Sequence, residues 1–171
     1  MLYYGDIISY MKNLANQNKN LLPDIAKIAT QNNFIGMDLE EFILGAADKL
    51  PSGNEGQFMV WINHQTNIDG QGEVKDNKTF LFYILKQYEA ENFAKQELAR
   101  IETEQTAHQL LGKMKKDSQE NVFWNHKFDN VRANVNPITR TDMATHYAGW
   151  MVDFRIVGNY KNCFDAADWH P

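Results

Sequence analysis

The first fifty residues carry apolar side chains at helical spacing in three separate stretches. They run from Ile7 to Ala15, from Ile25 to Ala29, and from Asp38 to Leu50. The segments between them are rich in Asn or contain Pro, and such segments end or begin helices. The pattern therefore predicts three short helices, which make residues 1–55 a helical N-terminal segment.

From Gln57 the apolar residues follow strand spacing instead of helical spacing. The runs Phe58–Ile62 and Thr79–Leu85 are apolar on both faces, which is typical of strands that are covered on both sides. Between them, Asn67–Gly72 has the Asn, Asp and Gly residues of a turn. Two such strands on either side of a turn predict a long β-hairpin.

The stretch from Glu89 to Lys116 predicts the longest helix of the chain. Five residues of this stretch form an apolar stripe, while polar residues occupy the outside: Ala94, Leu98, Ile101, His108 and Leu111. We expect the stripe to be the packing face of the helix. His108 would then be a core or interface histidine.

The last third of the chain returns to strand spacing. Val122–Phe128 alternates and then slips in phase by one before Val131–Val135, which predicts a bulge near Asp129 and Asn130. The last strand alternates most clearly: Ala148, Trp150, Val152, Phe154 and Ile156 form one face, and Tyr147, Met151, Asp153 and Arg155 the other.

The order of these elements predicts an α+β fold, in which an antiparallel β-sheet packs against one long α-helix. Residues 56–160 form this core module, with the helical N-terminal part before it and residues 161–171 as a C-terminal arm. No repeat or low-complexity linker interrupts it.

Composition narrows the class of protein. The chain has 171 residues, 43% of them hydrophobic, which is enough for the core of one domain. No apolar stretch is long enough to span a membrane, and no signal peptide is recognisable at the N-terminus. The formal net charge of −5 argues against nonspecific binding to nucleic acid or anionic lipid. The single cysteine, Cys163, excludes an intramolecular disulfide and a cysteine-based zinc cluster.

The sequence offers little catalytic chemistry. The five histidines lack the spacing of a helical zinc site, and no nucleophile or phosphate-loop motif is present. Asn67–Glu73 with Asp76 has a partial calcium-loop pattern, but a hairpin tip explains it better. We therefore predict no enzyme, no catalytic residue, no cofactor and no metal. The alternative is a small enzyme or an accessory ligand-binding domain that uses the strand region of His64 and His126.

The apolar surface exceeds what one helix can cover. Both hairpin strands are apolar on two faces, and Trp124, Trp150 and Trp169 add large aromatic side chains of the kind enriched at interfaces. A core that uses all of them within one chain is the equally weighted alternative. The residues we predict at a subunit interface are Asn67, Asp69, Gly70, Gly72, Trp124, Trp150, Phe164 and Trp169.

The closing strand carries a family resemblance. Gly149-Trp150-Met151-Val152-Asp153-Phe154-Arg155-Ile156, followed by Asn159 to Cys163, is similar to the closing strand of tail-terminator-like and head-to-tail connector proteins of tailed phages. Its Gly-Trp-x-Val-x-Phe pattern, which ends near Asn-x-Cys, resembles versions in phages of gut Bacteroides, including crAss-like phages. The element order over residues 56–163 resembles that family too, although the N-terminal helices are longer than the family pattern.

This resemblance implies a virion structural protein that forms a homo-oligomeric ring in the connector or tail. Its partners would be other copies of the chain and neighbouring connector or tail proteins, without a membrane. DNA would be only passing cargo in an acidic lumen. The location would be the tail or neck of the virion, after assembly in the cytoplasm of the bacterial host. The hairpin Asn67 to Asn77 and the C-terminal arm would make the ring contacts.

Overall fold

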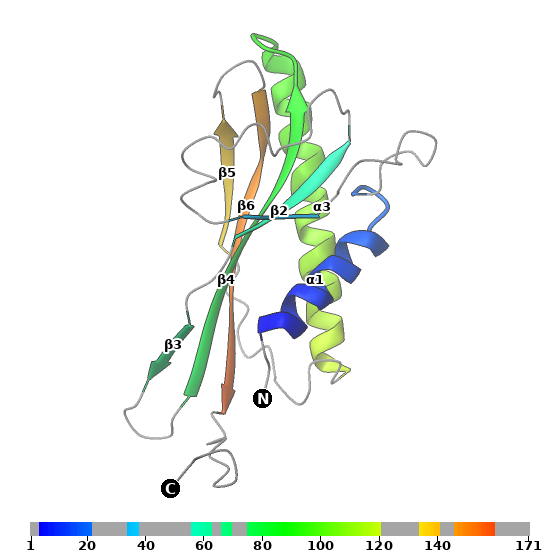
Figure 1. Cartoon of the computed structure of the whole chain (residues 1–171). Helices are drawn as coiled ribbons and strands as arrows, with labels where there is room; N and C mark the ends of the chain where they lie inside the picture. Colours follow the sequence, from blue (N-terminus) through cyan, green and yellow to red (C-terminus); the bar gives the residue numbers. More distant parts are fainter. Residues whose placement is uncertain are drawn as a thin grey trace, which may run out of the picture.

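The computed structural model describes residues 4–21, 34–37, 56–62, 66–69, 75–120, 134–140 and 146–159. Along the chain the elements are α1 (Tyr4–Gln17), β1 (Phe34–Met37), β2 (Gln57–Ile62), β3 (Thr66–Asp69), β4 (Lys75–Tyr88), α3 (Phe93–Gln119), β5 (Asn134–Arg140) and β6 (His146–Asn159). Figure 1 shows one sheet with α1 and α3 on one side of it. The predicted α+β class, with a long helix packed against the sheet, is confirmed.

The sheet has the strand order β1-β2-β4-β6-β5, and β3 pairs with the first residues of β4. β4 and β6 are the central pair and run antiparallel over their whole length, from Lys75 opposite Asn159 to Tyr88 opposite His146. β1 runs parallel to β2, so the sheet is mixed and not purely antiparallel as predicted. β5 lies at the other edge, where Pro137 is tolerated because an edge strand has a side without ladder hydrogen bonds.

The face of the sheet toward the helices carries an aromatic core. The ring centroids of Trp61 and Phe80 lie 5.4 Å apart, and those of Phe80 and Phe154 lie 5.3 Å apart. Onto them pack apolar residues of both helices, among them Met11 of α1 and Leu110 of α3. The two helices and this face therefore form a single core.

The opposite face of the central strands is apolar and buried as well. Its members come from β1, β2, β4 and β6: Ile35, Phe58, Val60, Ile62, Tyr83, Leu85 and Tyr147. Neither α1 nor α3 contributes to this cluster. The prediction that β2 and β4 are covered on both faces is confirmed.

The predicted packing face of the long helix is wrong. Ala94, Leu98, Ile101 and His108 are exposed, and only Leu111 of the predicted stripe is partly buried. The buried residues of α3 are instead Ala99, Thr103, Thr106, Ala107, Leu110, Met114 and Asp117. The hydroxyl of Thr103 donates to the carbonyl of Ala99 at 2.6 Å, so this polar side chain is hydrogen-bonded inside the core.

The boundaries of the long helix also differ from the prediction. The helix begins at Phe93 because the side chain of Asn92 accepts a hydrogen bond from the backbone N–H of Lys95 at 3.1 Å, as an N-cap does. Glu91 just before it has a φ of 60°, which no helical residue adopts. The predicted start at Glu89 is therefore four residues too early.

The N-terminal part agrees with the sequence in its first helix and differs in one strand. α1 confirms the helix predicted around Ile7–Ala15, while the two predicted helices over 25–29 and 38–50 lie outside the described residues. The sequence pattern does not predict β1. Because β1 pairs with β2, the N-terminal segment contributes a strand to the sheet.

Later strands agree in pattern and differ in extent. Thr66–Asp69, which has turn-like residues, forms β3 opposite Lys75–Lys78. In β6, Val152 and Phe154 belong to the helix-side core and Tyr147 to the opposite face, so the predicted alternation is confirmed. The predicted bulge and the alternating run before it lie outside the described residues.

Candidate functional site

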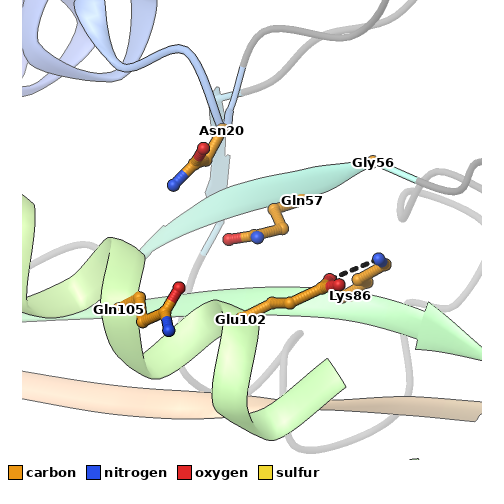
Figure 2. Close-up of a pocket in the computed structure, with 6 residues that line it drawn as sticks. All are labelled: Asn20, Gly56, Gln57, Lys86, Glu102 and Gln105. Carbon is orange, nitrogen blue, oxygen red and sulfur yellow. Dashed lines mark hydrogen bonds and ion pairs between the residues drawn. The ribbon is translucent and has the colours of Figure 1, made fainter. Parts of the chain in front are cut away.

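A shallow polar pocket lies where the end of α1 meets the sheet and α3. It has a volume of about 330 Å³ and is lined by Asn20, Gly56, Gln57, Lys86, Glu102 and Gln105. Asn20 follows α1, Gln57 and Lys86 are register partners on β2 and β4, and the last two residues lie on α3. Figure 2 shows the Gln57 side chain directed into the space between Asn20 and Gln105.

The charges in the pocket neutralise each other. The ammonium of Lys86 donates to Oε2 of Glu102 at 2.5 Å, and both side chains are partly exposed. Asn20 donates through its amide to the hydroxyl of Thr106 at 3.1 Å. The buried Oε1 of Gln57 accepts no hydrogen bond from the described residues. The described lining residues therefore offer amide donors and acceptors that suit a small polar molecule or water, and none of them carries a hydroxyl, thiol or imidazole.

A second polar cluster joins the two helices. Tyr10 of α1 donates its hydroxyl hydrogen to Oδ2 of Asp117 at 2.8 Å, and Lys113 forms an ion pair with the same carboxylate. Asp117 is 3% exposed. Burial, and then the hydrogen bond and charge of Asp117, raise the pKa of Tyr10 well above its ordinary value. These residues fix α1 on α3, and each charge has a partner.

The predicted interface residues fall into three groups. Asn67 and Asp69 lie on β3, and Trp150 lies on β6. Gly70, Gly72, Trp124, Phe164 and Trp169 lie outside the described residues, as do His64 and His126 of the alternative interpretation. The structure therefore places β3 and Trp150 on one sheet, and a role of these residues in subunit contacts stays a prediction.

Trp150 has a clear role within the chain. Its indole Nε1–H donates to the backbone carbonyl of Arg100 on α3 at 2.7 Å, and its ring is partly buried against the helix-side core. Gly149 before it pairs with Leu85 on β4. Gly149 thus joins β6 to β4, and Trp150 joins β6 to the long helix.

The sequence prediction missed an exposed apolar surface on α3. We call Ala94, Leu98, Ile101, Gln105, His108 and Gly112 the outer stripe; all six are exposed. Leu98 is 52% and Ile101 46% exposed, and the neighbouring Phe93 is 82% exposed. His108 lies 3.9 Å from a carboxylate oxygen of Glu104 and is not a core residue. The helical spacing of the apolar residues was the right signal, assigned to the wrong environment.

Among the described residues, no group of three or more His, Cys, Asp or Glu is placed to hold a metal ion. Within the same ranges, neither helix is both long and apolar enough to cross a membrane.

No family model matches the chain, and no curated protein matches it.

Proposed function

We propose that the protein is a structural subunit that assembles with copies of itself into a ring in the head-to-tail connector or tail of a tailed phage. The observation that carries the proposal is a strand extension made of β3, residues 75–79 of β4 and residues 155–159 of β6. It includes the hairpin from Asn67 to Asn77, for which the closing-strand resemblance implies ring contacts.

The strand extension runs away from the helical layer. β2 pairs with β4 only as far as Leu81, and β5 pairs with β6 only as far as Asp153. Beyond these points β3, β4 and β6 continue alone among the described elements, and Figure 1 shows their lower ends diverging from α3. An element that leaves the body of a subunit is well placed to reach a neighbour.

The extension also has two outer backbone edges, one on β3 and one on the last residues of β6. Within the described residues, β3 pairs with β4 alone, and the last residues of β6 pair with β4 alone. Unpaired strand edges readily add a strand from another chain. Two different edges on one subunit fit a head-to-tail contact, which closes into a ring when the rotation between copies is right. The net charge of −5 suits a channel through which DNA passes without binding.

Native mass spectrometry and light scattering over a concentration series test the proposal directly, and electron microscopy of particles tests the place of the ring. We expect one closed oligomer of fixed stoichiometry. A monomer at every concentration, with no ring of this chain in the virion, would overturn the proposal.

Two proline variants test whether the edge of β3 makes the contact. Neighbouring residues of a strand direct their N–H groups to opposite sides, so Asn67→Pro and Ile68→Pro remove donors from opposite edges. One variant breaks the pairing with β4 and lowers the melting temperature. The other removes only an outward donor; we expect it to melt like wild type and to form no ring. Normal ring assembly by that second variant would exclude the β3 edge.

A further inference from the structure

The outer stripe has the spacing of a helix-pairing surface. From Ala94 to Gly112 its members are separated alternately by four and three residues, and Lys115 continues the series. This is the spacing of residues that face a second helix in a coiled coil. The stripe lies opposite the residues that α3 buries against the sheet, such as Thr103 and Leu110, so a second helix would meet it from the solvent side.

The distribution of charged residues along α3 favours an antiparallel over a parallel second helix. Glu89 and Glu91 precede the helix, whereas Lys113, Lys115 and Lys116 lie near its end. Several of these charges are paired within the chain: Glu89 with Lys95, Lys113 with Asp117, and Lys116 with Glu120. Neither Glu91 nor Lys115 has an ion-pair partner within the described ranges. In an antiparallel pair, the acidic start of each α3 lies next to the basic end of the other.

We infer that the outer stripe binds the outer stripe of a second copy of this chain, as an antiparallel α3–α3 pair about a two-fold axis. In the register that sets Leu98 against His108 of the second copy, Ile101 faces Gln105, and Lys115 lies beside the start of the second helix, which Glu91 precedes. Ala94 then meets Gly112, where an added Cβ would have no heavy atom within 4 Å, so the helices have room to approach. Antiparallel helix dipoles favour the same direction.

The contact is modest in size. The exposed fractions of Leu98 and Ile101 correspond to roughly 150 Å² of apolar side chain per copy, against about 800 Å² per partner in a stable complex. The pair therefore forms at high protein concentration, or where another contact already holds the copies together. A two-fold contact closes after two copies and is distinct from the head-to-tail ring contact, so each can fail without the other.

Disulfide trapping tests the direction and the register. With Cys163→Ser as background, Leu98→Cys combined with His108→Cys is expected to give a covalent dimer on oxidation. Leu98→Cys alone is the control: in the antiparallel register its two copies are about 15 Å apart along the axis, beyond the reach of a disulfide. The same separation prevents a bond within one chain. Equal trapping by the single variant would indicate a parallel pair, and absence of trapping by the double variant would also overturn the inference.

Charge reversal gives a second, independent measurement by sedimentation equilibrium. Lys115→Glu is expected to weaken pairing about tenfold, because the two-fold axis repeats the change twice. Adding Glu91→Lys should restore it. Lys19→Glu on the exposed turn after α1 makes the same charge change away from the stripe and should have no effect. Failure of the double reversal to rescue would refute the charge pairing.

The pairing is measured in the β3 proline variant that forms no ring, so that ring assembly does not mask it. Leu98→Glu should weaken pairing there about a hundredfold and leave ring formation in the wild-type background intact. A protein that forms rings but never pairs through α3 would overturn this inference alone. A protein that pairs through α3 but forms no ring would overturn only the proposed function.

Discussion

Replacing Gly149 with alanine tests the closest approach between the two central strands. A Cβ at this position would lie 1.9 Å from the carbonyl oxygen of Ile84, 2.9 Å from its carbonyl carbon and 3.0 Å from the Cα of Leu85. Carbon and oxygen atoms in neighbouring strands normally stay at least about 3.3 Å apart. All three atoms belong to the backbone, so no side-chain rotation relieves the clash, and β4 or β6 must move by more than an ångström.

The cost of this movement is at the upper end of the range for overpacking. Adding a methylene to a packed core costs about 1–3 kcal/mol. The strand that moves also carries Val152 and Phe154 into the helix-side core, and Trp150 with its bond to α3. We therefore expect Gly149→Ala to lower the free energy of unfolding by about 3 kcal/mol. For a chain of this length, that lowers the melting temperature by about 6–12 °C.

Urea unfolding followed by tryptophan fluorescence measures the change, with an unaltered m-value as the sign that the same transition is observed. Gly112→Ala is the matched control, because Gly112 is exposed in α3 and an added Cβ there meets nothing within 4 Å. It should raise the free energy of unfolding by about 1 kcal/mol through helix propensity. If Gly149→Ala unfolds at the same urea concentration as wild type, the close approach of the strands is wrong.

Three further predictions concern contacts of α3. Asp117→Ala should lower the free energy of unfolding by about 2 kcal/mol, because it removes the buried acceptor of the Tyr10 hydroxyl; Asp117→Asn, which keeps an acceptor, should lose less in the same urea assay. Since the pKa of Tyr10 is raised in the folded state, its proton is lost first from the unfolded chain, and stability should fall above about pH 10 by up to about 1.4 kcal/mol per pH unit. Unfolding curves of Tyr10→Phe should lack this part of the slope, and identical slopes for both proteins would contradict it. Trp150→Phe should lower the free energy of unfolding by about 1 kcal/mol through loss of the bond to the Arg100 carbonyl, and an unchanged value would mean that water replaces the indole N–H at this carbonyl at no cost.

The central strands could be predicted from the sequence because their pattern is local. In β6, Val152 and Phe154 alternate with residues of the opposite face, and a strand has this period whatever packs on it. In β2, the run from Phe58 to Ile62 is apolar at every position, and all five residues are buried. Patterns of this kind identify strands and buried faces without knowledge of the fold.

The short strands could not be predicted, because distant pairing creates them. β1 has four residues and pairs with β2, where Phe34 lies opposite Met59. β3 has the Asn and Asp residues of a turn, and its pairing with the first residues of β4 decides its conformation. The polar pocket has the same origin, since Gln57 and Glu102 come from distant elements and belong to no sequence motif.

The orientation of α3 shows why an apolar stripe is an uncertain guide to a packing face. The sheet presents large rings to the helix, including Trp61 and Phe80, and small residues such as Ala99 and Ala107 let α3 pack closely above them. Thr103 is compatible with this face because its hydroxyl bonds to the carbonyl one turn earlier, which leaves its methyl group for packing. Since the described residues leave Leu98 and Ile101 exposed, the apolar character of these two side chains does not come from packing against the described part of the chain, and it fits the proposed contact with a second copy.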